Sequence, residues 1–416
     1  MQDESMKGRD ESCTATRWLS IVGIGEDGVA GLSSVAKRLV SSADLVVGGK
    51  RQLGLADGLI RGRRLPWPSP IHDVLPEIEK HRGRPVAVLA SGDPFHYGVG
   101  AMLLGRVPAK EMLCLPQPSS FSLAAARLGW SLQDVSLVSL HGRAFETIVR
   151  YLQPGARILA LAWNGETPRQ LARLLAERAM GQSKIVVMES MAGPRERVRS
   201  ATAEGFDLAD VAVLNIIAVE IVASAAAVVL PLAPGLNDAL FESDGQLTKR
   251  DVRAVTLSAL APRQGELLWD VGLGAGSIAI EWLLCHASLK AIGFEERPER
   301  AARAAHNAAT LGTPNLEIVQ GRAPDAFEGQ PQPDVIFIGG GLCDPGVLDA
   351  AWAALKPGGR FVSNAVTIES ESRLTQCFQH HGGELLRLQV AKAARVGSAF
   401  AWRAAMPITQ WRARKP

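Results

Sequence analysis

Runs of branched apolar residues recur along the chain, separated by segments with helical spacing. In the first half the runs are WLSIVGIG (18–25), DLVVGG (44–49), PVAVLASGDP (85–94), RILALAW (157–163), KIVVMES (184–190) and VAVLNIIAV (211–219). Few polar residues alternate with the apolar ones, which is typical of strands that helices cover on both faces. Between them, SVAKRLVSSA (34–43) has helical spacing, and SSFSLAAARLG (119–129) is predicted to be a helix with a serine cap and a glycine end. The pattern predicts an α/β fold.

This alternation is interrupted over residues 220–245 and then restarts. The interval is rich in alanine and proline before it becomes polar, so we expect a connection and place a domain boundary near residue 240. A helix is predicted over 249–261. Later strands are predicted at ELLWDVG, KAIGFEE, LEIVQG and DVIFIGG, with LKPGGRFVSNAV entering a fifth, and helices at SIAIEWLL and ERAARAAHNAATLG. We therefore expect a disordered tail (1–16) and two α/β domains (17–240 and 241–416).

Composition narrows the possible functions only slightly. Of 416 residues 47% are hydrophobic and 21% charged, which allows two full cores, and a net charge of +3 favours neither a nucleic-acid nor a membrane partner. The longest apolar stretch, 219–232, is too short for a bilayer span, and no secretory signal is seen at the start of the chain. The five scattered cysteines lack CxxC spacing, and His72, His141 and His306 lack the spacing of metal ligands. We expect a cytoplasmic protein with reduced thiols and no metal site.

One glycine-rich turn, in LLWDVGLGAGSIAIEWLL (267–284), indicates a ligand-binding site. Gly272, Gly274 and Gly276 lie between an apolar strand and a helix, and Asp270 lies two residues before the first of them. A helix start exposes unpaired N–H groups, and glycines allow positive φ angles and the close approach of a ligand. A tight strand–helix connection without a ligand is the alternative.

The two following strands extend this pattern. Glu295 ends the next strand, where an acid can hold both ribose hydroxyls of a nucleoside. The third strand runs into GRAPDAF (321–327), where backbone groups near Ala323 can meet an adenine. Gly-Leu-Gly-Ala-Gly differs from the dinucleotide pattern and resembles motif I of class I methyltransferases, which bind S-adenosylmethionine (SAM); LKPGGRFV (355–362) resembles a late turn and strand of that fold. A nicotinamide cofactor and a purely structural turn are the alternatives.

Three segments of the second half resemble the decarboxylating precorrin methylases of the CbiT type: TKRDVRAVTLSAL (248–260), DVGLGAGSIAIEW (270–282) and DVIFIGGG (334–341). The resemblance implies that Thr248 contacts SAM. It also implies that a loop of Gly339, Gly340 and Gly341 lies beside the methyl group and the substrate, with a plain turn as the alternative. The Asn/Asp-Pro-Pro-Tyr/Phe motif of many amino-group methylases is absent, which favours a carbon or another small-molecule acceptor.

Basic residues near the start of the second half are candidates for binding substrate carboxylates. They are Lys249, Arg250 and Arg253, and the alternative is a solvated helix face.

The first half resembles a different family, the tetrapyrrole methylases of the CbiE type. The matching segments are IVGIGEDGVAGLS (21–33), ADLVVGGKRQL (43–53), LASGDPFHYGVG (89–100) and PQPSSFSLAAARLGW (116–130). The resemblance implies two α/β subdomains with SAM in the cleft between them. The implied SAM-binding residues are Gly23, Gly25, Gly92, Asp93, Pro94, Ser119 and Ser120.

Simpler interpretations of these residues stay open. Gly92, Asp93 and Pro94 can form a simple Asp-Pro turn without a ligand, and Ser120 can be only a helix cap. His96 and Tyr97 can reach substrate or serve the structure. The usual Gly-x-Gly-Pro-Gly turn of the family is Gly-Ile-Gly-Glu-Asp-Gly (23–28) in this chain, so no role is carried over from its proline.

The two halves in this order resemble the fused, decarboxylating precorrin-6Y C(5,15)-methyltransferases of cobalamin biosynthesis. The resemblance implies one SAM in each domain and methylation of carbons 5 and 15 of precorrin-6B. It also implies loss of the ring C acetate carboxyl group, which gives precorrin-8X, and assembly into a homo-oligomer. A SAM-dependent methylase of RNA or protein is the first alternative function, and an NAD-linked or non-catalytic module is the second.

Overall fold

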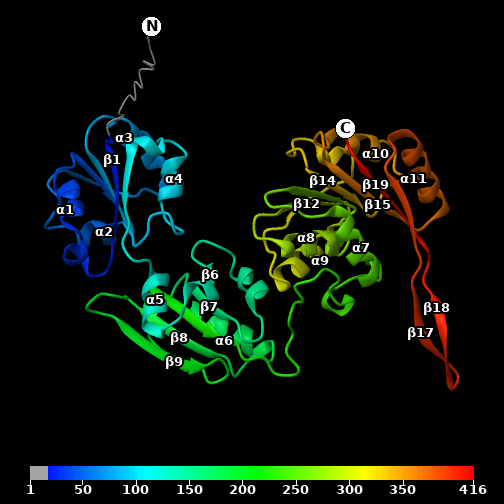
Figure 1. Cartoon of the computed structure of the whole chain (residues 1–416), viewed down its shortest axis with the longest axis horizontal. Helices are drawn as coiled ribbons and strands as arrows, with labels where there is room; N and C mark the ends of the chain where they lie inside the picture. The colour runs from blue at the N-terminus through cyan, green and yellow to red at the C-terminus, as the bar shows by residue number, and fades with distance from the viewer. Residues whose placement is uncertain (1–16) are drawn as a thin grey trace, which may run out of the picture. The chain divides into compact units, whose positions relative to one another are not determined.

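The computed structural model describes residues 17–416, which divide into two compact units (Figure 1). The N-terminal unit comprises 17–142 and Pro154–Ala227, and the C-terminal unit comprises Arg143–Gln153 and Val228–Pro416. The predicted tail lies outside the described residues, and the boundary near residue 240 stays a prediction. Within residues 17–416, no helix combines the length and the apolar character that crossing a membrane requires.

The first sheet of the N-terminal unit is parallel throughout, in the order β3-β2-β4-β1-β5. Its strands are β1 (Leu19–Ile24), β2 (Leu45–Gly48), β3 (Arg63–Pro66), β4 (Val86–Ser91) and β5 (Met112–Leu115); its helices are α1 (Ser34–Ser41), α2 (Lys50–Leu55), α3 (Leu75–Glu79) and α4 (Gly100–Leu104). Leu19 and Ile21 belong to one hydrophobic cluster, whereas Val22 and Ile24 belong to another. The unbroken apolar run of β1 is therefore buried on both faces, as predicted.

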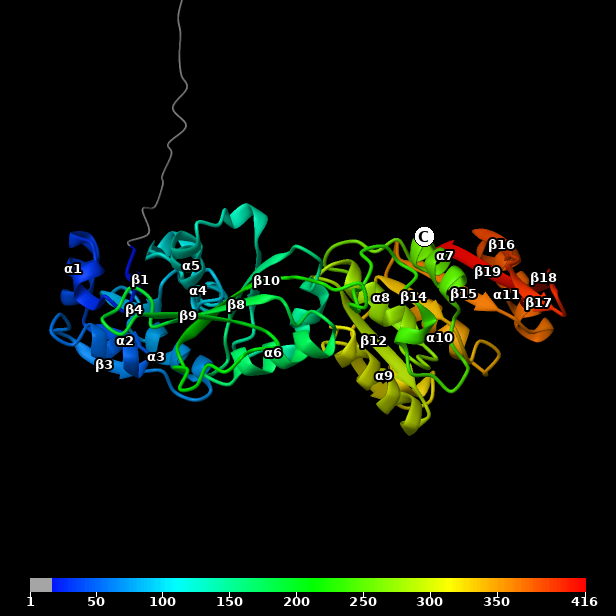
Figure 2. The ribbon, with the colours of Figure 1, turned by 90° about the horizontal axis from the view of Figure 1, so that it is seen from below.

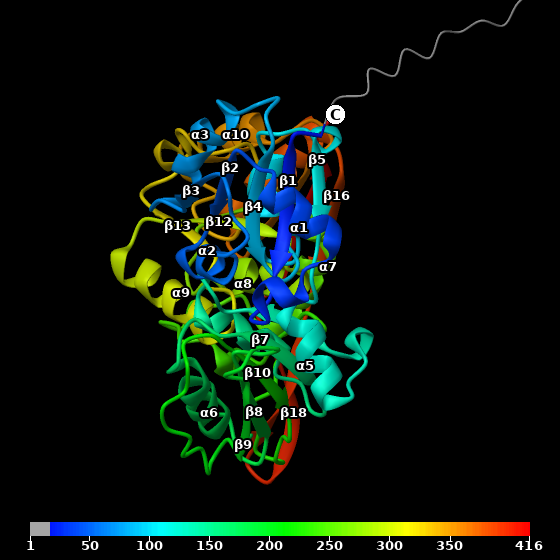
Figure 3. The ribbon, with the colours of Figure 1, turned by 90° about the vertical axis from the view of Figure 1, so that its left-hand side faces the viewer.

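The second sheet has the order β6-β7-β10-β8-β9 and is mostly antiparallel, with only β6 and β7 parallel. Its strands are β6 (Ser136–Ser139), β7 (Arg157–Leu161), β8 (Lys184–Glu189), β9 (Arg197–Thr202) and β10 (Asn215–Glu220). Helices α5 (Ser120–Leu128) and α6 (Thr167–Glu177) lie on opposite faces of this sheet (Figures 2 and 3). The predicted caps of α5 are confirmed, since Ser119 accepts a hydrogen bond from the amide of Ser122 and Gly129 is left-handed.

A seven-stranded sheet in the order β13-β12-β11-β14-β15-β19-β16 forms the C-terminal unit. Its strands are β11 (Leu267–Val271), β12 (Lys290–Glu295), β13 (Glu317–Gln320), β14 (Val335–Ile338), β15 (Arg360–Ala365), β16 (Glu384–Leu388) and β19 (Ile408–Arg414). The first five are parallel, and β19 is antiparallel to both of its neighbours. The parallel strands have the reversing order of a Rossmann-like sheet, which confirms the predicted fold class.

Helices cover both faces of this sheet. They are α7 (Arg250–Leu260), α8 (Ser277–Cys285), α9 (Pro298–Thr310), α10 (Val347–Ala354) and α11 (Ile368–His381). Trp269 and Val271 of β11 pack in one core with residues of α10 and α11. Because side chains alternate along a strand, Asp270 points to the other face, where α8 begins.

Two features of the C-terminal unit were not predicted. The hairpin of β17 (Ala391–Val396) and β18 (Ala399–Ala404) projects away from the sheet (Figures 1 and 3). The 3-10 helix η5 (Phe145–Tyr151) belongs to this unit although it lies far earlier in the chain. It packs against α9, and Arg150 donates hydrogen bonds to the carbonyls of Leu283 and Leu284 at the end of α8.

Candidate active site

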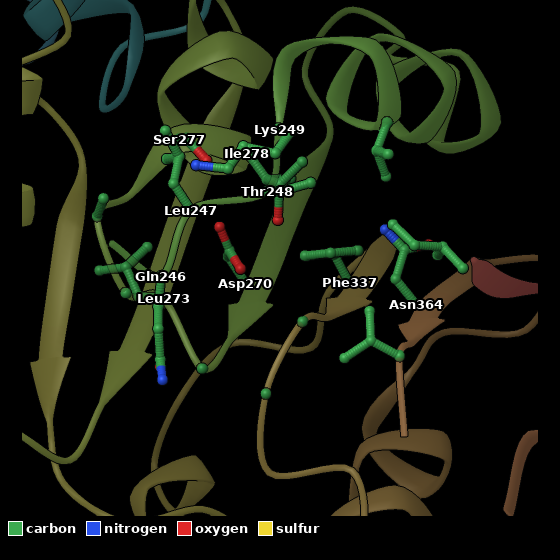
Figure 4. Close-up of a pocket in the computed structure, with 18 of the residues that line it drawn as sticks. Gln246, Leu247, Thr248, Lys249, Asp270, Leu273, Ser277, Ile278, Phe337 and Asn364 are labelled. Carbon is green, nitrogen blue, oxygen red and sulfur yellow. The ribbon is translucent and has the colours of Figure 1, made fainter. Parts of the chain in front are cut away.

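A cavity of about 1130 Å³ lies at the carboxyl ends of the parallel strands of the C-terminal unit (Figure 4). Ligands of open α/β sheets bind at this edge, where the strand order reverses. Ten residues predicted from the sequence line it: Thr248, Lys249, Asp270, Gly272, Gly274, Glu295, Ala323, Gly339, Gly340 and Gly341. The fold thus brings together segments that lie up to 93 residues apart in the chain.

The glycine turn has the left-handed backbone that its sequence predicts. The φ angles are +74° at Gly272, +58° at Gly274 and +78° at Gly276. A Cβ atom at Gly272 would lie 2.9 Å from backbone atoms of Gly340, so the turns after β11 and β14 pack backbone against backbone. Gly276 does not line the cavity; a Cβ there would lie 3.2 Å from the Cβ of Ala304, so this glycine lets α8 pack against α9.

Asp270 is a buried carboxyl group in the wall of this cavity, with 2% of its surface exposed. Its Oδ2 accepts a hydrogen bond of 3.0 Å from the amide of Ala279, in the first turn of α8. Burial raises the pKa of Asp270 to about 7; the hydrogen bond from Ala279 opposes the rise and the charge of Glu295 adds to it. A cationic ligand group beside this carboxyl would favour its ionised form.

Glu295 is held at the end of β12 by backbone groups. One carboxylate oxygen accepts from the amide of Gly274 at 2.8 Å, and the other from the amide of Arg297 at 3.1 Å. Each oxygen keeps a further lone pair that can accept from a hydroxyl group. Because Ala323 lines the same cavity, the arrangement suits a nucleoside whose ribose meets Glu295.

The other end of the cavity is apolar with cations at its edge. Phe337, Leu388, Val390 and Ile408 line it, together with Lys392 and Arg403 of the hairpin. The sequence analysis missed both cations because it did not predict the hairpin. A signal existed, since Gly397 and Ser398 form a two-residue turn between two strand-like runs, and Gly397 has a φ of +63°.

The predicted basic residues have three different environments. Lys249 lines the cavity, and Arg250 begins α7 and does not line it. Arg253 is fully buried, forms ion pairs with Glu281 at 2.5 Å and with Asp238 at 3.1 Å, and is therefore not available to a substrate. The interpretation of Arg253 as a carboxylate-binding or solvated residue is wrong, because its guanidinium satisfies a buried carboxylate.

In the N-terminal unit, predicted site residues meet where three turns pack together. A Cβ atom at Gly23 would overlap the carbonyl oxygen of Gly92 and lie 2.6 Å from the amide nitrogen of Gln117. Gly92 has a φ of +53°, and a Cβ there would lie 3.1 Å from the Cα of Ser119. Gly25 is adjacent, and a Cβ there would lie 2.7 Å from a carboxylate oxygen of Asp27. Gly23 and Gly92 meet backbone atoms and are required for close packing of the turns, whereas Gly25 meets the movable side chain of Asp27.

The neighbouring polar residues have structural hydrogen bonds. Asp93 accepts from the amide of Phe95 at 2.9 Å, and the carbonyl of Pro94 accepts from the amide of Gly100 at 2.8 Å. Ser119 is the cap of α5, so the alternative that Ser120 is only a helix cap is wrong: Ser120 is the first residue of the helix.

His96 and Tyr97 are held by the rest of this unit. The ring of His96 packs on that of Phe121 with 4.7 Å between centroids. The hydroxyl of Tyr97 donates to the carbonyl of Leu137 at 3.1 Å. In the turn that departs from the family pattern, Glu26 forms an ion pair with Arg51.

No group of three or more potential metal ligands is found within residues 17–416. The four cysteines in this part of the chain, Cys114, Cys285, Cys343 and Cys377, are free thiols.

Both halves of the chain match described families. Residues 19–207 match the Tetrapyrrole (Corrin/Porphyrin) Methylases, and residues 239–415 match the Precorrin methyltransferase domain. Over 401 residues the chain is 52% identical to the precorrin-6Y C(5,15)-methyltransferase (decarboxylating) of a Sinorhizobium species, covering 96% of this chain and 97% of that protein. The protein of the same name from Mycobacterium tuberculosis (strain H37Rv) is 39% identical over 396 residues, 94% of this chain and 98% of the relative.

A shorter relative combines two of the expected reactions in its name. The probable cobalt-precorrin-6B C(15)-methyltransferase (decarboxylating) of Saccharolobus solfataricus is 30% identical over 184 residues. The match covers 42% of this chain and 92% of the relative.

Proposed function

Because the chain belongs to the family of decarboxylating precorrin-6Y C(5,15)-methyltransferases, we propose that it methylates carbons 5 and 15 of precorrin-6B. In the same proposal it removes the carboxyl group of the ring C acetate side chain and yields precorrin-8X. The observation that carries the proposal is the cavity of the C-terminal unit, which joins nucleoside-binding groups to an apolar end with a cationic edge.

The residues of this cavity fit SAM. The carboxyl group of Asp270 has one hydrogen-bond partner and suits a cationic group, and Glu295 suits the two ribose hydroxyls. Gly272 lets its turn pack directly against Gly340 at the cavity wall, and backbone near Ala323 borders the adenine position. Thr248 closes the site from the segment before α7. When bound, SAM supplies a methyl group made electrophilic by its sulfonium.

The chain's own residues orient the acceptor and exclude water. The acceptor is an electron-rich ring carbon, so alignment with the donor and desolvation are the main requirements. Phe337 and the loop of Gly339, Gly340 and Gly341 border the space between the nucleoside end and the apolar end. Lys249 and Arg403 are placed to pair with carboxylates of the macrocycle, which suits an anionic tetrapyrrole, whereas Lys392 is paired with Asp251 at 3.1 Å.

Decarboxylation requires a different contribution. The bond between the acetate methylene and its carboxylate breaks, CO₂ leaves, and the electron pair enters the conjugated imine system of the macrocycle. One proton then completes a methyl group in place of the acetate. An apolar pocket favours this step, because it destabilises the localised carboxylate charge relative to the dispersed charge of the transition state.

We assign carbon 15 and the decarboxylation to the C-terminal unit, and carbon 5 to the N-terminal unit with a second SAM. The shorter relative supports placing these two reactions in one unit, since its name combines carbon 15 and decarboxylation and the match spans only 42% of the chain. Around the N-terminal site, Gly23, Gly92 and Ser119 come from three turns of one unit, which is consistent with a shared ligand site. Location in the cytoplasm stays a prediction.

Full-length variants test the division without separating the units. Gly272→Val places a side chain against the backbone of Gly340, and Gly92→Val places one against the Cα atom of Ser119. With precorrin-6B and SAM, mass spectrometry of the product should show no methyl group on carbon 15 for Gly272→Val. For Gly92→Val it should show CO₂ loss with one methyl group fewer. A methyl group on carbon 15 in the product of Gly272→Val would refute the assignment, and absence of all turnover by the unchanged chain would refute the function.

We also propose that the chain forms a homo-oligomer through the hairpin. Phe400 and Trp402 of β18 are 69% and 78% exposed, Met406 just after the hairpin is 71% exposed, and apolar surface of this kind is typical of interfaces. Light scattering should give a smaller assembly for Phe400→Ser/Trp402→Ser than for the unchanged chain. Ile368→Ser is the matched control, because Ile368 is exposed but lies outside the hairpin. An unchanged mass in the double variant would exclude the hairpin as the interface.

A further inference from the structure

Asn364 lines the cavity at the carboxyl end of β15 (Figure 4). In the sheet, β14 and β15 lie on one side of β11, whereas β12 and β13, which carry Glu295 and lead to Ala323, lie on the other. Asn364 is therefore on the opposite side of the central strand from the nucleoside-binding residues.

A chain of hydrogen bonds fixes the orientation of the Asn364 amide. Arg412 Nε donates to Gln410 Oε1 at 2.7 Å, and Gln410 Nε2 donates to Asn364 Oδ1 at 2.8 Å. Asn364 Nδ2 donates to Thr256 Oγ1 at 2.9 Å, and Thr256 Oγ1 donates to the carbonyl of Val252 at 2.8 Å. An arginine only donates and a carbonyl only accepts, so each amide between them can face only one way.

The partners behind Asn364 have no hydrogen-bond donor left for a ligand. Thr256 Oγ1 also accepts from Gln410 Nε2 at 3.2 Å, so its proton and both lone pairs are used. Thr256 and Gln410 are fully buried and do not line the cavity. Asn364 does line it, and its Nδ2 carries a second hydrogen beyond the one given to Thr256. The buried network thus holds one neutral donor at the cavity wall.

The surroundings make this donor different from the cations of the site. Phe337 lies near Asn364 in the cavity (Figure 4), whereas Lys392 and Arg403 belong to the hairpin. A cation paired with the carboxylate that leaves would stabilise the charge of the ground state, which disappears in the transition state. A neutral donor can orient that carboxylate while opposing its departure less than an ion pair would.

We propose that Asn364 donates a hydrogen bond to the acetate carboxylate that is lost as CO₂ and holds it in position for carbon–carbon cleavage. This inference rests on the proposed function and adds a substrate-binding residue to it. Asn364 orients the carboxylate, and the macrocycle accepts the electron pair. Lys249 and Arg403 are left for carboxylates that stay on the product.

The test uses the full-length chain with precorrin-6B and SAM, and it measures CO₂ release and methylated products separately. Asn364→Ala removes the donor. Asn364→Asp keeps the size and the oxygen that accepts from Gln410, but replaces the donor by a second oxygen. Both variants should lower CO₂ release by about 10- to 100-fold, the range for a hydrogen bond to a charged group. Methylated product that keeps its acetate should accumulate, and SAM affinity should stay within about twofold.

Ser363→Ala is the matched control. Ser363 is the preceding residue of β15, is fully buried, and donates to the carbonyl of Ile338 without lining the cavity. Its loss removes one buried hydrogen bond of the same strand and should leave the ratio of CO₂ release to methylation unchanged. Unchanged CO₂ release in Asn364→Asp, or an equal fall of methylation and CO₂ release, would overturn the assignment of Asn364. Failure of the unchanged chain to bind SAM or release CO₂ would instead overturn the proposed function.

Discussion

Asp270 should couple SAM binding to pH. Its pKa is raised from 3.8 to about 7 mainly by burial, which corresponds to a cost of about 4 kcal/mol for ionising it in the folded chain. The folded state therefore binds this proton more tightly than the unfolded state does. The stability that the folded chain gains from holding this proton is fully present below about pH 4. It is lost as the pH rises through 7, where the buried carboxyl group ionises.

A cationic group of SAM beside the carboxylate of Asp270 offsets the free-energy cost of ionising it. Binding then favours the ionised form, so a proton is released and affinity rises with pH up to about 7, by at most tenfold for each pH unit. Close to one proton should leave at pH 6 and about 0.1 at pH 8. Calorimetry in two buffers that differ in ionisation enthalpy measures this number directly.

Asp270→Asn is the decisive variant, because its amide oxygen can still accept from Ala279 but cannot ionise. The variant should release no proton from this site and show a flatter pH dependence of SAM affinity. Above pH 7 its apo form should be more stable than the unchanged chain, by up to about 4 kcal/mol in urea unfolding, and the gain should shrink toward pH 4. Equal proton release by both proteins at pH 6 would refute this account of Asp270.

Three further predictions concern single side chains. Gly272→Val should abolish SAM binding to the C-terminal unit in calorimetry. Gly54→Ala is the control and should leave binding unchanged, because no atom lies within 4 Å of its new Cβ. Equal SAM affinities of the two variants would contradict the packing argument. Arg253→Met should lower the free energy of unfolding by about 3–5 kcal/mol, because it leaves Glu281 buried without its cation. Adding Glu281→Met should recover part of this loss. Additive losses of the two substitutions in urea unfolding would contradict the prediction. Glu295→Gln should weaken SAM binding by about tenfold, because an amide accepts only through one oxygen, and unchanged affinity would exclude a role in holding the ribose.

Local pattern determined the strands and helices that carry the nucleoside end of the cavity. Apolar runs buried on both faces predicted β11 and β12, and the residues that end them, Asp270 and Glu295, were identified with them. Parallel strands place their carboxyl ends at one edge of the sheet, so residues at successive strand ends meet without further information. The same reasoning found Gly272 and Gly274, because positive φ angles are a local property of the chain.

Long-range packing decided the rest. Arg253 occurs in a basic segment that is typical of a solvated face, yet Glu281 from another helix makes it a buried partner. Lys392 and Arg403 reach the cavity only because a hairpin returns to it, and Asn364 becomes a fixed donor only through Gln410, which lies on another strand of the sheet. Sequence spacing specifies where strands and helices end, whereas the partners of a polar side chain depend on elements that meet it only after folding.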